Sequence, residues 1–141
     1  LIGKMKDTRQ GCLLEALRLK DNVKIAIKQT SKVLHQLKIS PNDGFNLLVE
    51  ENVVMESLIL HNIKTLTASC FKKYIVEFVE FFESETHYYL CLEHIKGQTL
   101  KSFIDECHHY LQTNRLRWSD FKVVCRFIFW QISITLYWLH Q

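Results

Sequence analysis

The stretch that decides the fold is residues 88–100, Tyr-Tyr-Leu-Cys-Leu-Glu-His-Ile-Lys-Gly-Gln-Thr-Leu. It belongs to an apolar, aromatic-rich run over 87–95, which a similar run over 74–82 precedes with Glu-Ser-Glu-Thr between them. Two such runs around a short polar turn predict an antiparallel hairpin. Lys96-Gly97-Gln98 then ends the second strand. Taken alone, the stretch also fits an ordinary edge strand that is followed by a glycine turn.

Upstream of this hairpin, the spacing of apolar residues predicts a second hairpin and then a helix. Residues 12–19 and 23–29 flank a Lys20-Asp21-Asn22 turn, and the second run alternates apolar and polar side chains. The polar stretch over 30–42 has turn and helix-cap chemistry. A helical period over 45–63 follows, with Asn42 or Asp43 as its N-cap. Its predicted inward stripe is Leu48, Asn52, Met55, Glu56, Ile59 and Ile63.

Two more helices are predicted downstream. The spacing of Leu100, Phe103, Ile104, Cys107 and Leu111 indicates a short amphipathic helix. A last helix over 120–141, with Ser119 as N-cap, is apolar nearly all round, which favours a helix buried in something larger. The order of strands and helices predicts an α+β fold. A chain of 141 residues that starts without Met and ends in this helix is expected to be part of a longer domain.

Composition and charge narrow the possible functions. The net charge is only +3 and the basic residues are scattered, which argues against nucleic-acid binding. The five cysteines are odd in number and lack C-x-x-C spacing, so we expect reduced thiols in a cytoplasmic or nuclear protein and no zinc ribbon. His108-His109 has no carboxylate-rich partner motif, and no metal site is predicted. The uncharged run over 127–140 is too short for a membrane span.

With these elements in order, the chain resembles the amino-terminal part of a protein kinase catalytic domain. Ile25-Ala26-Ile27-Lys28 resembles the V-A-I-K motif, whose Lys holds the α- and β-phosphates of ATP. Glu56 matches the helix Glu that pairs with this Lys, although Glu50 or Glu51 could take that role. Gln131-Ile132 and Leu136, followed by Trp138-Leu139-His140, resemble the end of the family's long central helix.

The resemblance implies a nucleotide site. Residues 88–100 match the fifth strand and hinge, so the Glu93 carbonyl and the Ile95 N–H would read adenine. Leu92 would be the gatekeeper, and Thr99 would sit near the ribose. Gly3 resembles the start of the first strand, and Gly11-Cys12-Leu13 resembles the end of the glycine-rich loop. The cofactor-binding residues implied are Gly3, Gly11, Leu13, Ala26, Lys28, Leu92, Glu93, Ile95 and Thr99.

The sequence departs from the family in the loop itself, because the middle glycine is absent between Gly3 and Gly11. Glycines there let backbone N–H groups approach phosphates closely. The resemblance favours an ATP-dependent kinase acting on Ser or Thr of a protein substrate. The departure keeps a pseudokinase that binds nucleotide or acts as a scaffold as an alternative, and an unrelated α+β interaction domain is a second one.

The resemblance also implies a domain organisation and a limit on activity. Residues 1–95 would be the small lobe with the hinge, an antiparallel five-stranded sheet plus one helix. Residues 96–141 would begin the helical large lobe. Neither the H-R-D catalytic loop nor the D-F-G motif occurs in the 141 residues, so Mg²⁺ would be held by residues outside them. The 141 residues alone are therefore expected to lack phosphotransferase activity.

Overall fold

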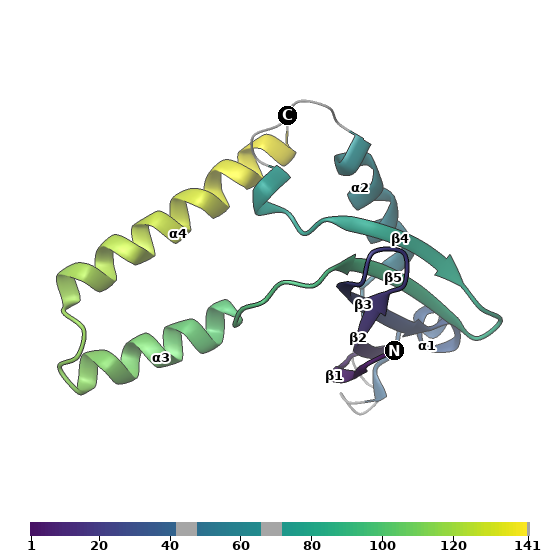
Figure 1. The fold of residues 1–141 in the computed structure, drawn as a ribbon, viewed down its shortest axis with the longest axis horizontal. Helices are drawn as coiled ribbons and strands as arrows, with labels where there is room; N and C mark the ends of the chain where they lie inside the picture. Colours follow the sequence, from purple (N-terminus) through teal and green to yellow (C-terminus); the bar gives the residue numbers. More distant parts are fainter. Residues whose placement is uncertain (42–47, 66–71, 141) are drawn as a thin grey trace. The chain divides into compact units, whose positions relative to one another are not determined.

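The computed structural model describes residues 1–41, 48–65 and 72–140, which form two compact units (Figure 1). The first unit comprises Leu1–Lys72 and Val76–Ile95. The second comprises Lys73–Ile75 and Lys96–Gln141. Each unit is described by itself.

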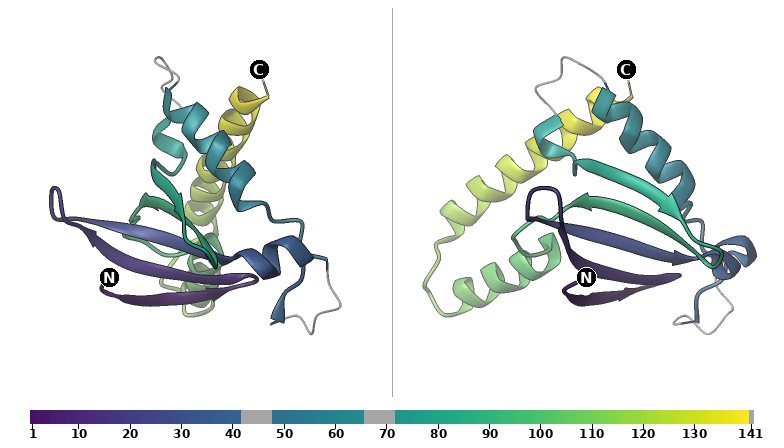
Figure 2. Two further views of the ribbon diagram at one scale, coloured as in Figure 1. Left: turned by 90° about the vertical axis from the view of Figure 1, so that its right-hand side faces the viewer. Right: turned by 45° about the vertical axis from the view of Figure 1, so that its right-hand side comes forward.

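The first unit is built on a five-stranded antiparallel sheet in the order β1-β2-β3-β5-β4, with helices α1 and α2 (Figure 2). Both predicted hairpins are present, which confirms the α+β class and the sheet. The predicted strand over 74–82 begins too early, because Lys72–Tyr74 forms a 3-10 turn and pairing starts at Phe78. The strands are β1 (Gly3–Thr8), β2 (Gly11–Arg18), β3 (Val23–Ser31), β4 (Phe78–Glu83) and β5 (His87–Glu93).

The β2–β3 hairpin shows how local chemistry sets the register. Asn22 has a φ of 56°, the left-handed conformation that Asn tolerates in a tight turn. The Asp21 carboxylate accepts hydrogen bonds from the Arg18 guanidinium at 2.9 Å and from the backbone N–H of Val23 at 3.3 Å. Beyond the turn, Arg18 pairs with Val23 and the register runs unbroken to Gly11 opposite Thr30. This register fixes which β2 residue flanks each β3 residue.

The two faces of the sheet are covered differently. On one face Ala16, Ile25 and Cys91 form a small buried cluster, against which Ile27 and Val79 pack. The other face carries Ala26 and Lys28, because side chains alternate along β3. Helix α2 (Val53–Thr65) contacts β4 and β5. Its buried residues are Val53, Ser57 and Leu60, spaced three and four apart.

Helix α2 differs from the helix predicted over 45–63. It begins at Val53, where the Asn52 side-chain oxygen accepts a hydrogen bond from the backbone N–H of Met55 at 3.0 Å. The caps predicted at Asn42 or Asp43 lie outside the described residues. The predicted stripe was also rotated, because Met55 and Ile59 are about half exposed while the buried face is the Val53–Ser57–Leu60 row.

A short helix, α1 (Lys32–Leu37), lies in the stretch that was predicted to be only turns and caps. Ser31 caps its start by accepting a hydrogen bond from the N–H of Leu34 at 3.5 Å. Lys38 ends the helix in the left-handed conformation, with a φ of 53°. The first unit therefore has two α-helices, α1 and α2, where the resemblance implied one.

The second unit contains α3 (Leu100–Gln112) and α4 (Trp118–Leu139). Thr99 caps α3, and its hydroxyl accepts a hydrogen bond from the N–H of Ser102 at 3.1 Å. The cap predicted at Ser119 is wrong: α4 starts two residues before Asp120 with Arg117 as N-cap, and no side-chain hydrogen bond caps it. None of its described residues is buried within this unit, which otherwise comprises mainly residues 73–75 and 96–117, so the burial expected inside something larger stays a prediction.

No helix in the described part of the chain is long and apolar enough to span a membrane.

Candidate active site

Lys28 occupies the centre of the sheet. Its strand, β3, lies between β2 and β5, and Lys28 pairs with Leu13 on one side and Leu90 on the other. Its side chain is only 14% exposed. A lysine that is buried to this degree requires an anionic partner or solvent contact for its ammonium group.

Two carboxylates provide that partner. The Lys28 ammonium nitrogen lies 2.8 Å from Oε2 of Glu56 and 3.5 Å from Oε1 of Glu51. The side chains of Glu56 and Glu51 are 38% and 47% exposed. Glu56 is therefore both the nearer and the better-buried partner. The sequence had left Glu50 and Glu51 open as alternatives, and Glu51 takes the secondary position.

The start of α2 positions Glu56. Its backbone N–H donates to the Asn52 carbonyl at 2.9 Å, so Glu56 lies one turn after the capping residue. Ser57, the next residue, is buried against the sheet, which leaves Glu56 at the edge of the packed face. A carboxylate at that edge can reach β3 while its other oxygen stays near solvent. The prediction that Glu56 projects from an apolar inward stripe was wrong in this detail.

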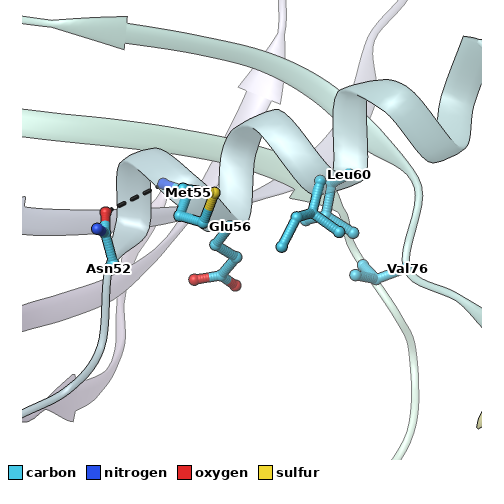
Figure 3. A pocket seen from close by; sticks show the side chains of 6 residues that line it. Asn52, Met55, Glu56, Leu60 and Val76 are labelled. Carbon is cyan, nitrogen blue, oxygen red and sulfur yellow. Dashed lines mark hydrogen bonds between the residues drawn. The ribbon is translucent and has the colours of Figure 1, made fainter. Parts of the chain in front are cut away.

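A pocket of 380 Å³ lies beside the Glu56 carboxylate. It is lined mostly by apolar side chains from one side of α2, with Val76 across from them (Figure 3). Figure 3 shows the Glu56 side chain extending away from the helix beside Met55, with Leu60 one turn further on. The Lys28–Glu56 pair thus borders an apolar recess.

The sheet register brings four of the predicted cofactor-binding residues together. Ala26 pairs with Glu15 on one side and with Leu92 on the other, two residues before the Leu13–Lys28 pair. Ala26, Lys28, Leu13 and Leu92 therefore share one sheet face in two adjacent cross-strand rows. Ala26 is buried and Leu92 is half-buried. The small Ala26 side chain, with Leu92 beside it and Leu13 in the next row, can accept a flat apolar ring.

The hinge residues follow directly from β5. The N–H of Glu93 donates to the Glu77 carbonyl at 2.9 Å, and its carboxylate accepts from the Glu77 N–H at 2.8 Å. These paired bonds fix the end of β5, after which Ile95 is exposed. Thr99 belongs to the second unit, where its hydroxyl is engaged in capping α3. The predicted site residues of β2, β3 and β5 thus lie together in the first unit, whereas Thr99 caps a helix of the second unit.

Sequence reasoning missed a polar network beside Ala26. The Glu15 carboxylate lies 2.7 Å from the Lys24 ammonium and 3.6 Å from Nε2 of His94. The hydrogen bond from Lys24 lowers the pKa of Glu15. The only sequence sign was a Glu inside the otherwise apolar run over 12–17, and nothing in it linked Glu15 to His94.

The two loop glycines differ in their surroundings. A Cβ on Gly11 would lie 2.0 Å from the Gln29 carbonyl oxygen, so only glycine fits there. A Cβ on Gly3 would meet nothing within 4 Å. The backbone geometry therefore requires glycine at Gly11, at the start of β2, and sets no such requirement at Gly3.

The family model described as "Protein kinase domain" matches residues 8–141. The chain belongs to the protein kinase family. This assignment confirms the resemblance and excludes the unrelated α+β interaction domain. Gly3 precedes the matched residues, whereas the other predicted site residues lie within them. A comparison with curated proteins found no match.

The family generally uses ATP and Mg²⁺, and the two fit the described residues differently. Lys28 fits the phosphates of a nucleotide, and the sheet face that carries Ala26 and Leu92 fits its base. In the ranges 1–41, 48–65 and 72–140, no three His, Cys, Asp or Glu side chains group closely enough to hold a metal ion. We therefore assign no Mg²⁺ ligand to these residues.

Proposed function

We propose that this chain forms the ATP-binding front part of a kinase that transfers phosphate to Ser or Thr of protein substrates. The observation that carries the proposal is the Lys28–Glu56 ion pair of 2.8 Å, in a chain matched to the kinase family over residues 8–141. Phosphoryl transfer depends mostly on positioning and charge stabilisation. A cation held on a central strand by a helix carboxylate supplies both.

Each candidate site residue of the first unit would have a distinct task. Lys28 would bind the α- and β-phosphates, and Glu56 would orient its ammonium group. The Ala26 face would receive the adenine ring, and the backbone of Glu93 and Ile95 would read its edge. Mg²⁺ would supply charge neutralisation on the β- and γ-phosphates when it is bound with ATP. The 141 residues alone would bind nucleotide without transferring phosphate, since they contain neither H-R-D nor D-F-G.

A pseudokinase that binds nucleotide is the second candidate. The specific observation in its favour is the loop between Gly3 and Gly11, which lacks the middle glycine that would let backbone N–H groups approach phosphates. Both candidates predict nucleotide binding, and only the kinase predicts transfer. We also propose a cytoplasmic or nuclear location, on the cysteine pattern alone.

The test combines binding and transfer. Mg·ATP should raise the melting temperature of the protein, because a ligand at 100 times its Kd stabilises by about 2.7 kcal/mol. Lys28→Met should weaken ATP binding by about tenfold or more, since a charge-assisted contact to phosphate is worth roughly 1.5–3 kcal/mol. Transfer to Ser and Thr of a protein substrate is then measured with labelled ATP on the whole kinase domain of which this chain would be the front part, since the 141 residues alone are expected to transfer no phosphate.

Lys32→Met is the matched control. Lys32 is 22% exposed and lies 2.6 Å from Glu83, so it resembles Lys28 in burial and pairing. It contacts the Tyr88 ring outside the candidate site, and its loss should leave ATP affinity unchanged. Binding without transfer by that whole domain would favour the pseudokinase. Failure of the wild-type protein to bind ATP, or equal losses in both variants, would refute the proposed site.

A further inference from the structure

The turn between β1 and β2 contains a buried polar side chain. Gln10 is only 2% exposed, although it lies in a two-residue turn at the end of a hairpin. Turn residues normally face solvent because their polar groups need partners. A buried glutamine in this place must therefore find its hydrogen bonds within the protein.

The partners come from α1 and the residues that follow it. The Gln10 side-chain amide donates to the Leu34 carbonyl at 3.1 Å and, more weakly, to the Ile39 carbonyl at 3.5 Å. Its backbone carbonyl accepts a hydrogen bond from the N–H of Ser31 at 2.9 Å. Side chain and main chain of Gln10 thus hold the turn to both ends of α1.

The Leu34 carbonyl lies in the last turn of α1 and has backbone partners of its own. It accepts hydrogen bonds from the N–H of Lys38, the left-handed residue that ends the helix, and from the N–H of Ile39 at 3.2 Å. The Gln10 amide is a further donor to the same carbonyl. The contact therefore joins the end of α1 to the turn.

A second contact holds the neighbouring residue. Gly11 packs so tightly on β3 that a Cβ would lie 2.0 Å from the Gln29 carbonyl oxygen. The turn is therefore fixed on β3 through Gly11 and on α1 through Gln10. A loop anchored at two adjacent residues needs little further ordering when a ligand binds.

We propose that Gln10 is a positioning residue that holds the β1–β2 turn, called here the anchored turn, in place to meet the nucleotide phosphates. This inference rests on the proposed function. In the family the loop at this position owes its fit to glycines; here order is provided by a buried amide. Through the anchored turn, the Leu34 and Ile39 carbonyls at the carboxyl end of α1 become part of the support of the nucleotide site, whereas the Lys32 side chain does not.

The experiment compares two ligands on the whole protein. Mg·ATP reaches the anchored turn through its phosphates, whereas adenosine has none, so the ratio of their Kd values reports on the turn. Gln10→Ala should raise the Kd for Mg·ATP between about 3-fold and 10-fold, which corresponds to the loss of one buried hydrogen bond. The Kd for adenosine should change less than about 2-fold, because adenosine has no phosphates to contact the turn. Gln10→Glu, which keeps the size but turns a carboxylate toward two carbonyls, should behave in the same way.

Cys91→Ala is the control for stability. Cys91 is buried in the opposite-face cluster with Ala16 and Ile25, so its loss loosens the same unit without touching the turn. It should shift the melting temperature while leaving the ATP-to-adenosine ratio unchanged. All Kd values are measured by calorimetry well below the lowest melting temperature.

The outcomes separate the two proposals. A wild-type protein that binds neither ligand would overturn the proposed function itself. If it binds both, and the Gln10 variants lose stability with an unchanged ratio, Gln10 has a structural role only and the positioning role is wrong. Tighter ATP binding by the variants would also overturn it, because the anchor would then hold the turn away from the phosphates.

Discussion

The coupling between Lys28 and Glu56 is open to a direct energetic test that requires no nucleotide. Two unit charges 4 Å apart attract by roughly 4 kcal/mol at an effective dielectric of 20, which sets an upper bound. Desolvation of Lys28 and the 38% exposure of Glu56 reduce that attraction. Fully exposed pairs contribute about 0.2–1 kcal/mol. For this half-buried pair we expect a coupling free energy of about 1 kcal/mol, at the upper end of that range.

The assay is a double-mutant cycle in urea with Lys28→Met and Glu56→Gln. Glu56→Gln should lower the free energy of unfolding by about 1 kcal/mol in the wild-type background and by close to zero beside Lys28→Met. The coupling should shrink at high salt, since the carboxylate is partly exposed. Lys28→Met alone has no fixed sign, because an apolar side chain can replace a buried charge without loss.

Glu51 supplies the internal control. Its carboxylate lies 3.5 Å from the Lys28 ammonium, against 2.8 Å for Glu56, and it is the more exposed of the two. Glu51→Gln should therefore couple to Lys28 less than half as strongly as Glu56→Gln does. Equal couplings, or a stronger one for Glu51, would refute the assignment of Glu56 as the principal partner. A zero coupling for both would refute the ion pair itself.

Three further predictions concern backbone fit, capping and titration. Gly11→Ala should destabilise by about 2 kcal/mol or more, measured in urea, because its Cβ would overlap the Gln29 carbonyl. Gly97→Ala, with nothing within 4 Å, should stay within about 0.5 kcal/mol. Thr99→Ala should lower the free energy of unfolding by about 1 kcal/mol in the same assay, because it removes the hydroxyl that caps α3. Thr99→Ser keeps that hydroxyl and should lower it much less. Burial raises the pKa of the Cys91 thiol from 9.0 to about 11, so folding should weaken between these pH values, and Cys91→Ala should flatten that dependence.

The sheet was predictable because its information is local. The alternation over 23–29 and the aromatic run over 87–95 specify strands through a period of two, and the turn residues fix where each hairpin reverses. The row of Leu13, Lys28 and Leu90 also needs the pairing of β3 with β5, which skips β4 in the sequence and is not part of either hairpin. The residues expected at the nucleotide site came from the resemblance to the kinase family, and the register then places Leu13, Ala26, Lys28 and Leu92 on one face.

Helix boundaries were less predictable because several residues compete as caps. Asn42, Asp43 and Asn52 all have suitable side chains, and apolar spacing continues through 45–52. Asn52 is the one that accepts the N–H of Met55, and the buried row then starts at Val53. The choice depends on how α2 meets the sheet, which is a tertiary contact. Periodicity alone therefore placed the start of α2 eight residues too early and assigned the wrong residues to its buried face.

The contact between Gln10 and α1 could not be predicted from any local pattern, because it joins residues 24 and 29 positions apart. The missing middle glycine was interpreted as support for a pseudokinase, on the premise that glycine is what lets such a loop approach phosphates. The fold offers a second physical route to an ordered loop, in which a buried amide and the tightly packed Gly11 hold the turn. A glycine count therefore cannot separate an active kinase from a pseudokinase in this chain. The affinity ratio between ATP and adenosine measures the phosphate contact itself, and transfer of labelled phosphate by the whole kinase domain decides between an active kinase and a pseudokinase.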